Sequence, residues 1–175
     1  MGVHAPKLET VESLRKFCKK HRISTYGMLM ISKDDIIENC SKFNSKDLLF
    51  DENGFCVNYA KRFDNQSCSG NIVTTLESII PKSFIERDSL LTFQKESQKW
   101  VTFEDTSITA NISLSKGDYT LVSYWNTYAG KPNHIKRFSK LKKALASNKN
   151  CSISHIYVNQ DFRSDMDIEL NVKMR

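Results

Sequence analysis

The chain has 175 residues, of which 39% are apolar and 26% charged, and its formal net charge is +6. This length suits one domain or two small ones with a sizeable core, and the composition excludes a disordered chain. No membrane-spanning helix is expected, because no run approaches the roughly 18 to 20 apolar residues that such a helix needs.

The N-terminal half alternates helical and strand-like patterns. We expect helices at 9–21, 33–43 and 71–80, a strand at 26–32, and a β-hairpin at 48–59. Thr10 is the expected N-cap of the first helix, and Ile36 and Ile37 are expected to face inward from the second. The hairpin turn contains Asn53 and Gly54, which predicts positive φ angles at both residues.

The C-terminal half begins less regularly and then becomes clear. Its expected elements are a connecting helix within 82–99, extended pieces at 100–105 and 108–114, a strand at 119–125, a helix at 133–146, a strand at 151–161 and an edge strand at 165–174. The strand, helix and strand from 119 to 161 predict a right-handed, parallel βαβ unit.

These elements predict an α/β fold, a mixed sheet flanked by helices. They divide into an N-terminal half (1–81) that holds the hairpin and a C-terminal half (90–175) that holds the βαβ unit. One continuous domain is the alternative.

Basic residues cluster in two of the expected helices, as "KKHR" at 19–22 and "KRFSKLKK" at 136–143. Their spacing predicts solvated helix faces, with Arg137 outside beside Lys136, Lys140 and Lys143. A nucleic-acid partner is therefore not expected, whereas a basic surface for an acidic partner remains an alternative.

The five cysteines are widely spaced, and no two have the Cys-x-x-Cys spacing of a zinc knuckle or a dithiol redox motif. Cys18, Cys40 and Cys56 lie on apolar patterns that are typical of core residues. Cys68 lies in the polar stretch "DNQSCSGN" and is the thiol expected to be exposed. It is a candidate reactive thiol, and the alternatives are a plain loop residue and a structural disulfide partner.

The stretch "GDYTLVSYWNTYAGKPNHIKRFSKL" resembles the start of a thioredoxin-like domain of the peroxiredoxin and TlpA type. Tyr124 and Trp125 match the aromatic pair that ends the first strand, and 129–132 match the Cys-x-x-Cys motif. The likeness covers 117–161, and "LLFDENGFCVNY" also resembles the family's later hairpin. The resemblance implies a thioredoxin-like βαβ core. It is also the only feature that implies a periplasmic or other extracytoplasmic location, since the first residues show no secretory signal pattern.

The chain departs from this family in two ways. Ala129 and Pro132 replace both motif cysteines, so the loop lacks the thiolate and the resolving thiol that dithiol exchange needs. The hairpin precedes the βαβ unit instead of following it, and none of the chain's prolines matches the family's cis-proline. A permuted or duplicated arrangement, or a piece of a longer protein, would explain this order.

The resemblance therefore implies a redox-inactive, thioredoxin-like protein with a binding or structural role towards a protein or peptide partner. The residues of its degenerate active-site loop are Trp125, Thr127, Tyr128, Ala129, Gly130, Lys131 and Pro132. Trp125, Tyr128 and Lys131 could line a shallow peptide groove, although strand aromatics such as Tyr124 and Trp125 commonly pack beneath the helix instead. The alternative is a thiol-dependent oxidoreductase that uses Cys68.

Other constellations predict little chemistry. His134 and His155 have no nucleophile next to them in the sequence, and Asp161, Asp165, Asp167 and Glu169 lack the glycine-turned loop of a calcium site. No phosphate loop, GxSxG or HExxH motif is present. We therefore expect no metal and no cofactor, although catalytic residues brought together from distant positions are not excluded.

Overall fold

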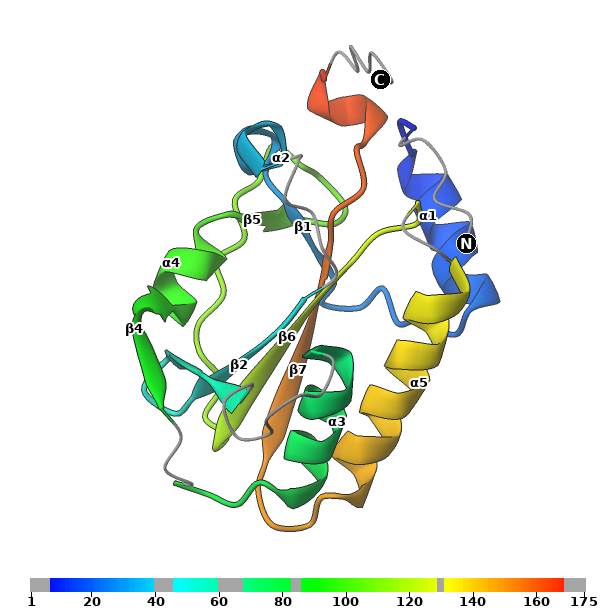
Figure 1. Cartoon of the computed structure of the whole chain (residues 1–175). Coiled ribbons are helices and arrows are strands. Elements are labelled where there is room, and N and C mark those ends of the chain that lie inside the picture. Colours follow the sequence, from blue (N-terminus) through cyan, green and yellow to red (C-terminus); the bar gives the residue numbers. More distant parts are fainter. Residues whose placement is uncertain (1–6, 40–45, 60–67, 83–85, 129–130, 169–175) are drawn as a thin grey trace.

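The βαβ unit forms the centre of one seven-stranded mixed sheet (Figure 1). The computed structural model describes residues 7–39, 46–59, 68–82, 86–128 and 131–168. The strands are β1 (Leu29–Ile31), β2 (Asp47–Asp51), β3 (Phe55–Val57), β4 (Arg87–Thr92), β5 (Trp100–Thr102), β6 (Tyr119–Trp125) and β7 (Ile153–Asn159). The helices are α1 (Val11–Lys20), α2 (Lys33–Asn39), α3 (Cys68–Ser78), α4 (Phe93–Ser97) and α5 (Lys131–Ser147), followed by the 3-10 helix η3 (Ser164–Met166).

The predicted βαβ unit is confirmed. β6 and β7 are parallel over seven registered pairs, from Tyr119 with Ile153 to Trp125 with Asn159, and α5 connects them. Every residue of β6 is buried, as expected for a strand that is covered on both faces.

The predicted hairpin is also confirmed, and it joins the same sheet. The strand order is β4-β3-β2-β6-β7-β1-β5, so β2 lies directly beside β6 and runs antiparallel to it. The halves 1–81 and 90–175 therefore both contribute strands to one sheet.

The hairpin turn differs from the prediction at Asn53. Only Gly54 has a positive φ there, of 80°. Asp51 explains the difference, because its Oδ1 accepts hydrogen bonds from the backbone N–H groups of Asn53 (3.0 Å) and Phe55 (2.9 Å). This side chain supports the turn with ordinary backbone angles at Asn53.

Helices cover the two faces of the sheet differently. Trp125, on one face, contacts both Phe17 of α1 and Phe138 of α5, and α3 packs along α5 (Figure 1). Tyr124 points to the opposite face, where its hydroxyl meets Glu96 of α4. The burial of strand aromatics beneath the helices, one of the two sequence interpretations, is thus correct for both residues.

Over the described residues, the first two helices agree with the prediction except at one position, and residues 40–43 of the second predicted helix lie outside the described ranges. Thr10 caps α1, with its hydroxyl accepting from Ser13 N at 3.1 Å and Ser13 Oγ accepting from Thr10 N at 3.0 Å. Ile36 is fully buried, but Ile37 is 52% exposed, so its predicted inward position is wrong. The helix is short and presents only a narrow stripe to the core.

Four further expectations are corrected. Residues 82–99 do not form a connecting helix, because β4 pairs with the outer edge of β3 before Thr92 caps the five-residue α4. α3 begins at Cys68 instead of Asn71, so Cys68 belongs to a helix and not to a loop. The predicted C-terminal strand starts as the 3-10 helix η3, and residues 169–175 lie outside the described part. Arg137 does not face outward, as described below.

No helix in the described ranges is both long enough and apolar enough to cross a membrane.

Candidate functional site

The sequence-predicted loop begins where the parallel strands β6 and β7 end. Ligands of open α/β sheets commonly bind at this edge, outside the carboxyl ends of the strands. Three segments meet here: 126–128 after β6, 160–163 after β7, and the residues just before α1. The last of these is held by backbone bonds, since Glu9 N donates to Phe162 O at 2.7 Å and Ser164 N donates to Glu9 O at 3.0 Å.

Asp161 holds the loop after β6 in place. Its carboxylate accepts from the backbone N–H of Thr127 at 2.8 and 3.1 Å and from the Thr127 hydroxyl at 2.7 Å. Asn159 Nδ2 donates to Oδ2 of the same carboxylate at 2.7 Å. These bonds occupy both oxygens of Asp161, so its role in this geometry is to fix the loop backbone.

Burial raises the pKa of Asp161 to about 6, against the hydrogen bonds from Asn159 and Thr127, which lower it. The carboxylate of Glu9 adds to the increase. A pKa in this range suits proton transfer near neutral pH. However, Asp161 is only 1% exposed, so this geometry gives a substrate no access to it.

Glu9 is the second buried carboxylate at this edge. The Thr127 hydroxyl lies 3.4 Å from Glu9 Oε1, Lys7 Nζ lies 3.1 Å from the same oxygen, and the hydroxyl of Ser13 donates to Oε2. Thr127 therefore lies between two carboxylates that come from opposite ends of the chain. This contact fixes the start of α1 against the loop.

The two aromatic residues of the predicted loop are placed differently. Trp125 is fully buried, with its ring stacked on Phe17 (centroids 5.7 Å apart) and edge-on to Phe138 (6.1 Å). It cannot contact a partner in this conformation. The ring of Tyr128 lies 6.4 Å from that of Phe162, measured between centroids. Because Tyr128 is only half-buried, part of its side chain faces solvent.

The remaining loop positions are only partly described. Ala129 and Gly130 lie outside the described residues, and Lys131 and Pro132 are the first two residues of α5. Cys68 is the first residue of α3, which packs along α5. Cys40, which the sequence places in the core, also lies outside the described ranges.

The cysteines whose side chains are described are poor nucleophiles. Burial raises the pKa of Cys18 to about 12 and that of Cys56 to about 11, and nearby carboxylates act in the same direction. Burial also raises the pKa of the half-buried Cys151. Because the thiolate is the reactive species, these three thiols are unsuited to redox exchange.

A serine, a histidine and an aspartate meet beneath α5, which sequence spacing did not reveal. Ser123 Oγ donates to Asp47 Oδ1 at 2.6 Å and lies 2.9 Å from His155 Nε2. Arg137 of α5 donates from Nε to Asp47 Oδ2 at 2.9 Å. The aspartate thus bonds to the serine and the arginine instead of orienting the histidine, unlike a catalytic triad. Ser123 is also fully buried.

Burial lowers the pKa of His155 to about 4, so its imidazole is neutral at physiological pH. Because the Ser123 hydroxyl donates its hydrogen bond to Asp47, its oxygen accepts in the contact with His155, and Nε2 of His155 is the donor there. This cluster joins β2, β6, β7 and α5, and we interpret it as structural.

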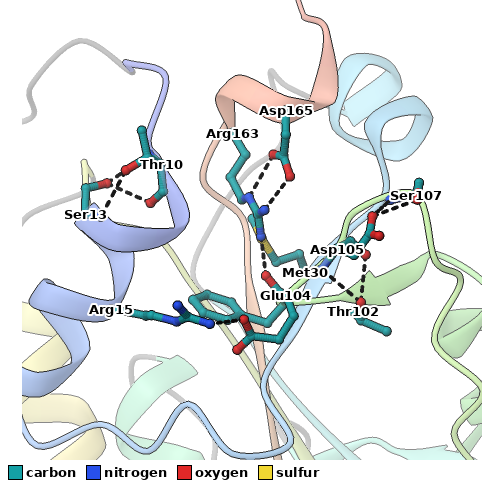
Figure 2. Close-up of polar contacts among 11 residues, drawn as sticks. Thr10, Ser13, Arg15, Met30, Thr102, Glu104, Asp105, Ser107, Arg163 and Asp165 are labelled. Carbon is teal, nitrogen blue, oxygen red and sulfur yellow. Dashed lines mark hydrogen bonds and ion pairs between the residues drawn. The ribbon is translucent and has the colours of Figure 1, made fainter.

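Arg163 anchors the segment that follows β7 (Figure 2). Its guanidinium is buried, donates to the carbonyl of Phe103 and to Met30 Sδ (3.3 Å), and pairs with Asp165. Figure 2 also shows Arg15 of α1 pairing with Glu104. Asp165 is therefore engaged in an ion pair and is not arranged as a metal ligand.

Among the described residues, no three His, Cys, Asp or Glu side chains come together as a metal site would require. Asp167 lies 3.7 Å from Lys33, and Glu169 is outside the described ranges.

A surface cavity of about 370 Å³ lies beside the hairpin turn, lined by Gly54, Phe93 and Leu114 among others. None of its lining residues is ionisable, so it offers no acid or base to a ligand.

Sequence reasoning missed Asp47, Glu9 and Arg163 as buried charged residues. A signal existed only for Asp161, which is the last residue of the predicted strand 151–161. Each of the other three has at least one partner that lies 60 or more residues away in the sequence.

No family model, curated protein or solved structure matches this chain.

Proposed function

We propose that the chain is a redox-inactive, thioredoxin-like binding protein whose hairpin precedes its βαβ unit. It would bind a protein or peptide partner beside the loop after β6. The thioredoxin-like assignment is supported by the hairpin β2–β3, which lies in the same sheet as β6 and β7 and directly beside β6. The family resemblance of residues 117–161 predicts these elements, in another chain order.

The observation that carries the binding role is the anchoring of the loop. The backbone N–H and the hydroxyl of Thr127 both donate hydrogen bonds to the buried Asp161, so the backbone that leads into Tyr128 is fixed. A pre-formed site avoids the entropic cost of ordering on binding. The loop has no thiol, and Trp125 is buried, so Tyr128 is the aromatic residue that can meet a partner.

A peptide-array experiment tests this proposal. The labelled protein is applied to immobilised peptides of varied sequence, alongside the variants Tyr128→Ala and Tyr26→Ala. Tyr26 is 96% exposed on another loop and is the matched control. We expect Tyr128→Ala to lose the bound peptides and Tyr26→Ala to keep them. The same peptides binding all three proteins would contradict the proposal.

Thiol chemistry at Cys68 is the second candidate. Cys68 begins an 11-residue helix, and reactive cysteines are commonly found at helix N-termini. Insulin reduction and peroxide consumption test it directly. Activity that Cys68→Ser abolishes would establish this function and refute the redox-inactive proposal.

A further inference from the structure

The positive charge of the chain is concentrated on two neighbouring helices. Residues 11–22 and 131–150, which contain α1 and α5, hold twelve of the 26 lysines and arginines but one of the 20 acidic residues, Glu12. The remainder of the chain therefore has more acidic than basic residues. A net charge of +6 conceals this separation.

The fold brings the two basic segments together. Phe17 of α1 and Phe138 of α5 both pack on Trp125, so the helices cover the same face of the sheet. Figure 1 shows the C-terminal end of α1 beside the N-terminal end of α5. The clusters "KKHR" and "KRFSKLKK", separate in the sequence, thus belong to one surface.

The lysines on these helices face solvent. The α1–α5 basic surface comprises Lys16, Lys19, Lys20, Lys136, Lys140 and Lys143, all exposed. No acidic side chain in the described part of the chain forms an ion pair with any of them. Arg137 is excluded from this surface because it is bound to Asp47.

This arrangement opposes the stability of α5. Lys136, Lys140 and Lys143 are spaced by four and three residues, so they lie in one row and repel one another. The first turn of α5 contains no acidic residue and the last turn contains no basic residue. Charges of these signs at these ends would interact favourably with the helix dipole. An anionic partner would relieve this repulsion.

The surface has features that select among anionic partners. No large apolar side chain is exposed on the described parts of α1 or α5, so neither helix can insert into a lipid surface or stack on unpaired bases. At the N-terminal end of α5, however, the half-exposed Tyr128 packs against Phe162. An aromatic contact next to a row of lysines suits a protein segment better than a duplex phosphate backbone, which offers no apolar group.

We propose that the α1–α5 basic surface binds an extended acidic segment of a partner protein, with an apolar side chain of that segment beside Tyr128. This inference rests on the proposed binding function and names its partner chemistry. The 17 residues of α5 extend about 25 Å, the length of roughly eight extended peptide residues. A segment of that size can span the row of lysines.

Fluorescence polarisation with designed peptides tests the inference. The probe is a labelled peptide of about ten residues, made of Asp and Glu with one Phe. The reference peptide has Asn and Gln in place of the acids. We expect the acidic peptide to bind the full chain, and K136E/K140E/K143E to weaken this binding about tenfold or more. The variant K136Q/K140Q/K143Q should weaken this binding less. It replaces the charge-reversal variant in the test if charge reversal perturbs folding.

The matched control is K82E/K95E/K116E, which changes the net charge equally at exposed lysines that are not part of α1 or α5. It should change the affinity less than about twofold. An equal loss in the control would overturn the inference, because net charge alone would then explain the binding.

The other outcomes separate the two proposals. If the Asn/Gln peptide binds equally well and needs Tyr128, the acidic partner is wrong and the proposed function stands. Tighter binding to duplex DNA or to phosphatidylserine vesicles overturns the partner class. If neither peptide binds, the inference fails, whereas the proposed function fails only if the peptide array also shows no binding that depends on Tyr128.

Discussion

The carboxylate of Asp161, just beyond the end of β7, accepts hydrogen bonds from both the N–H and the hydroxyl of Thr127, just beyond the end of β6. The two residues leave adjacent parallel strands at the same edge of the sheet. Thr127 lies past the last paired residue of β6, so the buried carboxylate of Asp161 accepts the hydrogen bonds that a neighbouring strand would otherwise accept. The chain can then leave the sheet and turn towards α5. The site proposed for binding begins at this contact.

The stability of the fold should depend on the ionisation of Asp161. The pKa of Asp161 is about 6 in the folded protein, above its ordinary value of 3.8. A raised pKa means that the folded state binds the proton more tightly, so this contribution is fully present below pH 4 and is lost as the pH rises through 6. Relative to Asp161→Asn, the wild type should lose about 2 to 3 kcal/mol of unfolding free energy between pH 4 and pH 7.

Urea unfolding of both proteins across that pH range provides the measurement. The comparison with Asp161→Asn removes the contributions of the other titrating groups. A difference between the two proteins that stays constant with pH would show that Asp161 titrates normally.

The described core thiols should be unreactive in the folded protein. With pKa values of about 12 and 11, Cys18 and Cys56 are thiolate to about one part in a thousand or less at pH 8. A chromogenic disulfide should label them only after unfolding. Mass spectrometry of the labelled protein identifies the sites, and rapid labelling of either cysteine in native buffer would disprove their burial.

Periodicity was sufficient for much of the fold. The all-buried run of β6, the apolar stripe of α5 and the start of β7 are local patterns, and together they predict the βαβ unit. The hairpin was equally local, because Gly54 and the flanking apolar residues mark it. Its pairing with β6, about 70 residues later in the chain, leaves no local signal.

The errors have physical causes of the same kind. Residues 87–92 are largely exposed and show no clear period, and they become a strand because β3 offers an unpaired edge. Arg137 lies within a row of lysines and is basic like them, yet it faces inward because Asp47 is buried nearby. The candidate site was predicted at Trp125 and Tyr128, but the carboxylates that shape it, Glu9 and Asp161, could not be paired from the sequence.

Removing the charge of Arg137 should strongly destabilise the protein. Its guanidinium pairs with Asp47 and also reaches the carbonyl oxygens of Tyr124 (3.3 Å) and Lys46 (3.2 Å). Arg137→Met leaves Asp47 buried without its cation, which costs about 3 to 5 kcal/mol. The double variant with Asp47→Asn should recover part of this loss, because the unpaired charge is gone. Chemical denaturation of the single and double variants measures both effects, and strictly additive losses would contradict the pairing.

Glu96 should stabilise the opposite face of the sheet in its ionised form. Burial alone would raise the pKa of Glu96, but Lys46, Lys99 and the hydroxyl of Tyr124 outweigh burial and lower it. Tyr124 donates to its Oε1 at 2.6 Å, and Lys99 lies 2.7 Å from Oε2. A lowered pKa means that this stabilisation is present above pH 4.5 and is lost as the pH falls through the folded-state value.

Glu96→Gln should therefore reduce the unfolding free energy by about 1 to 3 kcal/mol at pH 7 and by less in acid. Glu104→Gln is the matched control, since Glu104 pairs with Arg15 at the exposed surface and should lose less than about 1 kcal/mol. Denaturant unfolding at pH 7 and pH 4 distinguishes the two variants. Because Glu96 bonds to the tyrosine that precedes Trp125, its loss should also loosen β6 where the loop begins, which amide exchange at Trp125 and Thr127 would report. Equal effects of the two substitutions, or a larger loss at pH 4, would refute an ionised Glu96 beneath the site.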